Sequence, residues 1–476
     1  MTDTKALRCL FLGVALAVSP RQATLAGAPG PLREASSEFL SAGTAPSEGL
    51  PVESDWMERV DRAETNMRRG LYREAAQEFR AVYKFVRVAF PTDTRRVAIA
   101  HDLALALLNL GHAIQAMRVL TTATQAVQAL LPADEPFRYR IAAARGRCRL
   151  ELGDLEGGLE ELSDAVHHLT AVDGMGAVYR IEALLLQGQA LVMAADTGKA
   201  WNVAVEAEDL ARRVHGMDHP GRAKALNLLG FLEMSPHPDR AEIRFDEAWS
   251  IFQSRFPDGH PDAIPILTNK GLLALARSDG PEAQVFFKQA YDIATRFLPP
   301  AHPTGAMSAA NLAHGLINIG KDNEARPLFA SALEILENRL GKDHISLAPI
   351  LDQLAALDLR LSRLEEARAE ALRSLRIHED HQGNETVQLV SALFTLASLE
   401  AGENRISESL EFLDRGLRLQ AAVGGAGSPV LLSGLGMKAN LLYQGGRVED
   451  ARVVAKEIRE ICHGAGIEVP KMGGLE

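Results

Sequence analysis

The sequence predicts an all-α protein, an α-solenoid of about ten helix-turn-helix units. Small residues recur along the chain at a period of 41 or 42 residues, and apolar residues follow the spacing of one helix face. Aromatic residues make up only 5% of the chain, whereas strands are enriched in branched and aromatic side chains. A period of this length is typical of stacked units that bury one another's faces in a continuous core.

The amino terminus has the residue order of a secretory signal peptide. Lys5 and Arg8 precede an apolar run over residues 9–18, and small residues with a candidate cleavage site near Ala26 follow. Ten apolar residues are too few to span a bilayer as a helix. We therefore expect a signal peptide over residues 1–26 and export to the periplasm or the exterior. A chance apolar start, in a cytoplasmic protein, is the alternative.

Residues 27–54 are rich in Ala, Gly, Pro, Ser and Glu, a composition that predicts a disordered linker. The solenoid is expected over residues 55–466, and residues 467–476 form a tail. In the last predicted unit, Ile458 and Ile461 face outward unless this tail or another chain covers them. Self-association is therefore one of the possible states.

Three columns of small residues locate the two helices of each unit. The column twelve residues before the central one runs from Ala63 to Ala439 and is large only at Leu229. The column seven residues after it is small in eight of ten units. Two antiparallel helices need small side chains where their backbones approach most closely. The central column is Ala75, Ala116, Gly158, Ala200, Ala241, Ala283, Ala325, Ala367, Ser409 and Ala451.

Glycine and histidine-proline pairs mark the ends of the first helices. Glycine five residues before the central column predicts a helix end at Gly70, Gly111, Gly153 and Gly320. Proline suits the first helical position, where its missing N–H costs nothing. Proline follows His219, His260 and His302, and His344 recurs at the same interval without it. These four histidines are interpreted as caps or packing residues of the joints.

These repeats resemble a known family. Ala-Ala-Asn-Leu-Ala at 309–313, Glu-Ala-Arg-Pro-Leu-Phe at 324–329 and Gly-Lys-Asp-His at 341–344 are similar to tetratricopeptide repeats of the 42-residue kind found in kinesin light chains. The resemblance covers roughly residues 55–466. It implies a right-handed superhelix whose first helices line a concave face, where a protein or peptide binds.

A ladder of amides on the first helices is the candidate partner-binding site. It consists of Asn227, Asn269, Asn311 and Gln353, at intervals of 42 residues. An amide both donates and accepts, so a ladder can pair with the main chain of an extended peptide. The resemblance to kinesin light chains implies this role, and the alternative is that the amides only tie adjacent units together. Nearby cations could meet an acidic segment or form a solvated face, and they are Lys224, Lys270, His314 and Arg360.

Other features favour no catalytic, cofactor or metal chemistry. The formal net charge of −11 argues against nucleic acid as a partner, and the three cysteines have no metal or redox spacing. Residues 424–428 are rich in glycine but lack the lysine of a phosphate loop, so we expect a connector. His378 and His381 are interpreted as surface histidines of a loop, and His168 as a partly buried core histidine.

The function expected from these observations is a non-catalytic scaffold or adaptor that binds a protein or peptide segment. The first alternative is a regulatory sensor, in which peptide binding changes the curvature of the solenoid. The second is an enzyme hidden in the solenoid, which needs a pocket with converging ionisable groups. No segment beyond the amino terminus reaches the length of a transmembrane helix.

Overall fold

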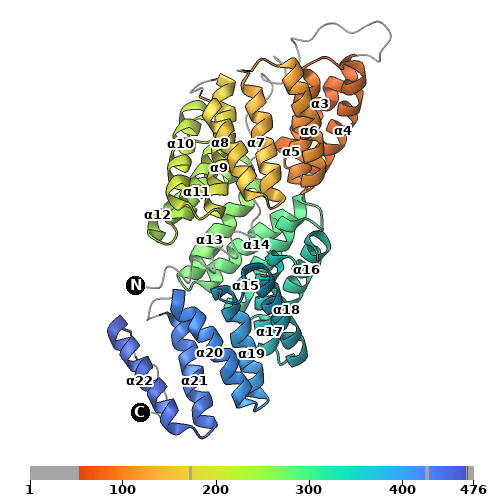
Figure 1. Ribbon diagram of the computed structural model, residues 1–476. Helices are drawn as coiled ribbons and strands as arrows, with labels where there is room; N and C mark the ends of the chain where they lie inside the picture. Colours follow the sequence, from red (N-terminus) through yellow and green to blue (C-terminus); the bar gives the residue numbers. More distant parts are fainter. Residues whose placement is uncertain (1–52, 134, 171–173, 424–427, 468, 470–476) are drawn as a thin grey trace. The chain divides into compact units, whose positions relative to one another are not determined.

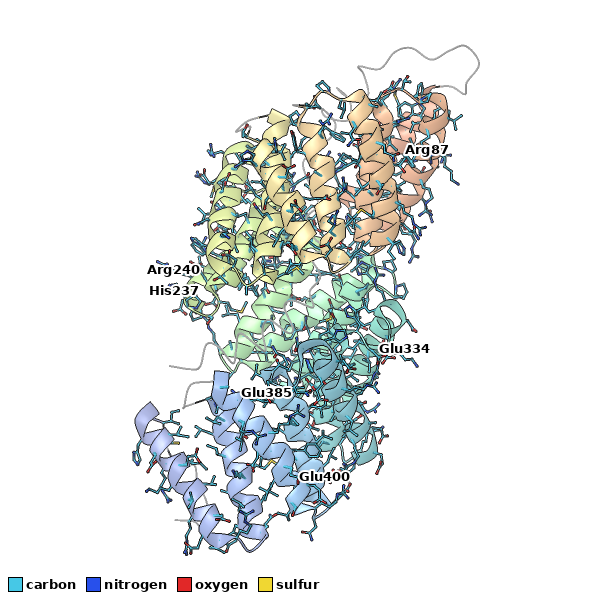
Figure 2. All side chains as sticks on the ribbon, in the orientation of Figure 1. Arg87, His237, Arg240, Glu334, Glu385 and Glu400 are labelled. Atoms are coloured by element: carbon cyan, nitrogen blue, oxygen red, sulfur yellow. The ribbon has the colours of Figure 1, made fainter. Side chains whose placement is uncertain are left out.

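The structure is a computed structural model that describes residues 53–133, 135–170, 174–423, 428–467 and 469. Within these ranges it contains twenty α-helices, three short 3-10 helices and no strand (Figure 1), which confirms the predicted all-α class. Figure 2 shows the side chains on the same ribbon. The expected signal peptide, residues 27–52 of the expected linker, the connector at 424–427 and most of the tail lie outside the described residues. Residues 53 and 54, which were expected in the linker, are the first residues of a helix.

The chain divides into two compact units between Ser308 and Ala309. The helices of the amino-terminal unit are α3 (Glu53–Arg68), α4 (Tyr72–Ala89), α5 (Arg95–Asn109), α6 (Ala113–Leu130), α7 (Pro136–Glu151), α8 (Leu155–His168), α9 (Gly174–Met193), α10 (Thr197–His215), α11 (Pro220–Glu233), α12 (Pro238–Arg255), η1 (Pro261–Ala263), α13 (Ile264–Ala276) and α14 (Gly280–Phe297). The division falls inside α15 (Pro303–Asn318).

The helices of the carboxy-terminal unit are α16 (Asp322–Leu340), η2 (Ile345–Leu347), α17 (Ala348–Arg360), α18 (Leu364–Gln382), η3 (Val387–Leu389), α19 (Val390–Gly402), α20 (Ile406–Val423), α21 (Pro429–Gln444) and α22 (Val448–Ala465). The odd-numbered α-helices are the first helices of ten consecutive pairs, and the even-numbered ones are the second. The number of described pairs therefore matches the ten predicted units.

The three columns of small residues lie where predicted, between the two helices of each pair. Nine members of the central column have no exposed surface, and the tenth, Gly158, is also buried. A Cβ on Gly271 would lie 2.5 Å from the Phe287 ring, and one on Gly230 would lie 2.6 Å from the Phe245 ring. The small residues are required because an aromatic side chain of the second helix packs against the backbone of the first.

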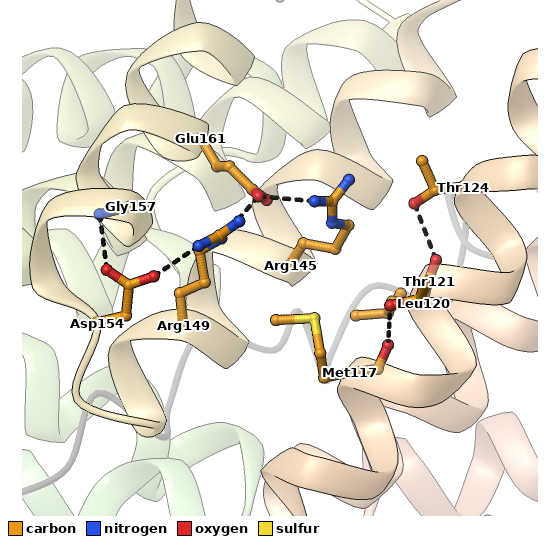
Figure 3. A network of polar contacts seen from close by, with 9 residues as sticks. All are labelled: Met117, Leu120, Thr121, Thr124, Arg145, Arg149, Asp154, Gly157 and Glu161. Carbon is orange, nitrogen blue, oxygen red and sulfur yellow. Dashed lines mark hydrogen bonds and ion pairs between the residues drawn. The ribbon is translucent and has the colours of Figure 1, made fainter.

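Charged residues connect the two helices of the pair α7 and α8 (Figure 3). Asp154 caps α8 by accepting from the Gly157 N–H at 3.0 Å, and it pairs with Arg149 at 2.6 Å. Arg145 and Arg149 both contact Glu161 of α8, at 2.9 and 2.8 Å. Gly157 leaves room for this network, since a Cβ there would lie 2.6 Å from Asp154 Oδ2.

Most of the first helices are followed by a residue in the left-handed backbone conformation. Gly70, Gly111, Gly153 and Gly320 all have positive φ, between +75° and +89°. In four of the five repeats that lack this glycine, another residue takes the same left-handed conformation, and these residues are Ala195, Ser278, Ser362 and Asn404. The fifth has Pro236 at this position, and the proline ring does not allow a positive φ. The turn is thus set by the repeat geometry, and glycine is the residue that adopts it most readily.

The histidines at the joints are N-caps, as predicted. In each, Nδ1 accepts a hydrogen bond from the backbone N–H two residues later. The distances are 3.0 Å for His219, 3.1 Å for His260, 3.0 Å for His302 and 3.2 Å for His344. The acceptor must be an unprotonated ring nitrogen.

Two other histidine predictions were wrong. His168 is exposed, and its ring is stacked on the ring of Tyr139 with the two centroids 4.5 Å apart. It is not buried because it is the last residue of α8. His378 and His381 lie near the end of α18 and not in a loop, although His381 is exposed as expected of a surface residue. His378 is buried, with Nε2 3.7 Å from Asp352 Oδ2.

The carboxy-terminal end of the core is covered in part by the tail. Ile458 of α22 is fully buried, and Ile461 is half-buried. Val469 of the tail packs against the same cluster of apolar side chains. Val469 thus contributes to the first of the two expected coverings, and self-association stays a prediction.

Candidate functional site

The amide ladder begins in the amino-terminal unit with Asn227 of α11 and Asn269 of α13. The Asn269 Nδ2 group donates to Asn227 Oδ1 at 3.0 Å, so side chains of two successive repeats are in contact. Asn269 is buried with 8% of its surface exposed, and Asn227 is half-buried. The structure therefore brings together the first two of the four predicted residues.

The other two residues of the ladder belong to the carboxy-terminal unit. Asn311 lies on α15 and is buried, with 3% of its surface exposed. Gln353 lies on α17 and is half-buried. Both keep the position of the first pair within their repeats. Their role in binding a partner stays a prediction.

The cations near the ladder are paired with carboxylates of the same chain. Lys270 pairs with Asp246 and lies over the Phe286 ring, with Nζ 4.6 Å from the ring centroid. Lys224 pairs with Asp262 at 2.6 Å, and both side chains are buried. Arg360 and Asp322 are 2.9 Å apart. Their positive charge is therefore largely balanced within the protein.

His314 of α15 differs from these three cations. It is half-buried, and burial lowers the pKa of its imidazole. A neutral imidazole at neutral pH can donate and accept a hydrogen bond but offers no charge to an acidic partner. We therefore expect His314 to contribute hydrogen bonding at most.

A buried ionic group on the first helices was missed from the sequence. Arg140 of α7 and Glu182 of α9 form a buried pair, with Nε and Oε2 3.2 Å apart. His101 of α5 lies close to them, and burial lowers its pKa, as does the charge of Arg140. A signal existed, because Arg140, Glu182 and Lys224 are spaced by 42 residues.

This arrangement supplies hydrogen bonding and buried ion pairs. Among the described residues, no group of three or more His, Cys, Asp or Glu side chains could hold a metal ion. Cys148 and Cys462 are free and buried, and burial raises the pKa of Cys148 to about 12. A thiol with this pKa stays protonated at neutral pH, and a protonated thiol is a poor nucleophile.

Comparison with known proteins agrees with these repeats. The sequence profile of the tetratricopeptide repeat matches residues 305–380, which span α15, α16, α17 and most of α18. Residues 305–380 are thus tetratricopeptide repeats. The other helix pairs carry the same buried columns of small residues, so the repeats extend through both units.

Solved structures with similar folds include the following two proteins. One is a Rap protein complexed with Competence and Sporulation Factor, at 14% identity and a TM-score of 0.52, covering 78% of this chain and 99% of that chain. The other is the apo form of the quorum sensor NprR from B. thuringiensis, at 12% identity and a TM-score of 0.52, covering 77% and 99%. At these identities the likeness shows the fold alone.

A putative kinesin light chain from Podosopora anserina with nearly identical tetratricopeptide-like repeats also matches, at 19% identity and a TM-score of 0.37, covering 43% of this chain and 98% of that chain. No curated protein matches the chain. Within the described residues, none of the helices combines the length and the apolar character needed to cross a membrane.

Proposed function

We propose that this tetratricopeptide-repeat protein binds a protein or peptide segment on its first helices and acts as a non-catalytic scaffold. The hydrogen bond between Asn227 and Asn269 carries the proposal, because it places the amides of successive repeats within 3.0 Å of one another. An extended peptide repeats its N–H and C=O groups along its length, so a row of amides can pair with its main chain whatever its side chains are.

The bond between Asn227 and Asn269 leaves capacity for a ligand. It uses one donor hydrogen of Asn269 and one acceptor site of Asn227, whereas each amide has two donor hydrogens and an acceptor oxygen with two lone pairs. A peptide backbone can therefore add to the pair or replace the bond. Repeat families of this kind are generally non-catalytic, which supports a binding role.

The first prediction concerns the ladder itself. We expect Asn269→Ala combined with Asn311→Ala to weaken binding of peptides selected from a displayed random library by at least about tenfold. The loss of the Asn227–Asn269 bond should cost only about 1 kcal/mol of stability. Binding is measured by calorimetry, and stability by thermal unfolding.

Asn202→Ala is the matched control, since Asn202 is exposed on α10, a second helix. It should leave binding and stability unchanged. Equal binding by the double variant and the control would contradict the proposal. Loss of binding together with loss of helicity would assign the amides a structural role instead.

A regulatory sensor is the second candidate. The Rap and NprR structures support it, because one is a complex with Competence and Sporulation Factor and the other is a quorum sensor. A sensor requires that peptide binding alter repeats that the peptide does not touch. Hydrogen exchange of the full chain with and without a selected peptide tests this, and changes limited to the contacted helices would favour the scaffold.

We further propose that the protein is exported, on the order of charged, apolar and small residues before Ala26. Mass spectrometry of the protein from its native source should find a new amino terminus near residue 27. An intact amino terminus on protein from the cytoplasm would contradict export.

A further inference from the structure

The first and sixth repeats of the amino-terminal unit are in contact. Gly70 follows α3 and packs on Pro261, because a Cβ on Gly70 would lie 2.4 Å from Pro261 Cδ. The Tyr72 hydroxyl donates to Asp262 Oδ1 at 3.4 Å, although the two residues are 190 positions apart. One buried cluster joins Trp56 and its neighbours to Ile264 and Leu267 of α13.

A second contact joins the second and seventh repeats in the same way. His302 Nε2 donates to the Asn109 carbonyl at 2.9 Å, across 193 positions of sequence. Asn109 is the last residue of α5, where backbone carbonyls have no partner within their own helix. Both contacts thus join the end of a first helix to the start of a first helix five repeats later.

His302 uses both ring nitrogens in this contact. Nδ1 accepts from the Thr304 N–H at 3.0 Å, which places the proton of the neutral ring on Nε2, the atom that faces Asn109. His260 occupies the equivalent position one repeat earlier, and its ring lies beside Gly70 and the backbone of Arg68. His219, His260 and His344 form the same caps, but in the described structure none of their Nε2 atoms makes a hydrogen bond.

We propose that these contacts act as a latch. The latch holds the repeats of the amino-terminal unit as a closed turn of the solenoid and restricts access to Asn269. The latch consists of Gly70, Tyr72, Asn109, Pro261, Asp262 and His302. Helix α13 connects it to the amide ladder, because α13 carries both Asn269 and the two apolar residues, Ile264 and Leu267, that pack on the first repeats. The closed turn stands on these contacts alone, and only its role in regulating a ligand rests on the proposed function.

Two substitutions in the full chain open the latch while keeping the local fold. His302→Asn retains a side-chain oxygen that caps Thr304, but the side chain is too short to reach Asn109. Gly70→Ala introduces a methyl group against Pro261. His219→Asn is the control for the first, since it changes an equivalent cap that makes no second bond.

Gly320→Ala is the control for the second substitution. Gly70 and Gly320 both have φ of +75°, so alanine costs the same backbone strain at each, but nothing lies within 4 Å of a Cβ at Gly320. Any difference between these two variants therefore reports the contact with Pro261 and not the conformation of the turn.

Hydrogen exchange of residues 60–72, 100–112 and 258–270 is the first measurement. We expect at least tenfold faster exchange in His302→Asn and Gly70→Ala than in the matched controls. The second measurement is the rate at which N-ethylmaleimide labels Asn269→Cys, which needs no ligand. This rate should rise at least tenfold when either latch substitution is added, whereas the rate for Asn202→Cys should not change.

Equal exchange in the latch variants and their controls would overturn the closed turn. Faster exchange with an unchanged labelling rate at position 269 would overturn the control of access. A failure to select any peptide would bear on the proposed function and would leave both of these measurements intact.

Discussion

At the scale of single residues, one histidine at each of four joints performs a backbone function. Capping needs an unprotonated Nδ1, and the joints provide the environment that keeps it so. Burial, followed by the charge of His215, lowers the pKa of His219 to about 3, and burial lowers that of His260 to about 4. Both imidazoles are therefore neutral in the folded protein across the physiological range.

Acid should destabilise the fold through these caps. Between pH 6.5 and about 4 the unfolded chain binds protons that the folded His219 and His260 do not, so stability falls as the pH falls through this window. From pH 7 to pH 5 each histidine should cost about 2 kcal/mol. In His219→Asn, which keeps a cap, the loss measured by urea unfolding should be smaller by about this amount. An unchanged pH dependence would contradict the assignment.

The left-handed residue that follows most of the first helices gives a second prediction at this scale. Ala195 has φ of +59° at the position that glycine occupies in other repeats. Ala195→Gly should raise the free energy of unfolding by about 0.5–1 kcal/mol, since glycine adopts this conformation without the steric cost. Ala194→Gly, one residue earlier and without positive φ, should instead destabilise the protein in the same urea titration.

At the scale of helices, the close approach of neighbouring helices decides which residues are tolerated. Helix α21 contains two glycines in different surroundings. A Cβ on Gly434 would lie 2.7 Å from the Phe394 ring and 2.8 Å from Leu417, whereas nothing lies within 4 Å of one on Gly436. Helical propensity is the same at both positions, so they separate packing from propensity.

Gly434→Ala should therefore destabilise the protein by about 1–3 kcal/mol, because the added methyl group overpacks the core. Gly436→Ala should stabilise it by about 0.5–1 kcal/mol, because alanine favours the helix. Thermal unfolding of the two variants beside the parent chain measures both effects. Shifts of equal sign would mean that propensity, and not the contact with Phe394, governs α21.

At the scale of the whole molecule, the two compact units differ in how their repeats touch. In the carboxy-terminal unit, α19, α20, α21 and α22 pack chiefly on neighbours along the chain. Gly434→Ala should thus speed hydrogen exchange in α19–α22 and leave α16 unchanged. In the amino-terminal unit, the latch joins repeats that are five apart. Gly70→Ala should therefore speed hydrogen exchange near residue 261.

The repeats themselves could be predicted from the sequence, since each unit depends on residues within about 42 positions. The small columns, the glycine turns and the histidine caps all report local geometry, and each was found where expected. The amide ladder was visible for the same reason. His168 was predicted wrongly because periodicity does not show where a helix ends.

Contacts that join distant repeats were decided only by the tertiary structure. The bond between Asn269 and Asn227 depends on how two units stack, and the burial of Arg140 with Glu182 depends on how α7 faces α9. The contact of His302 with Asn109 depends on the accumulated rotation of five units. Small rotations at each joint add up along a solenoid, and no single repeat encodes their sum.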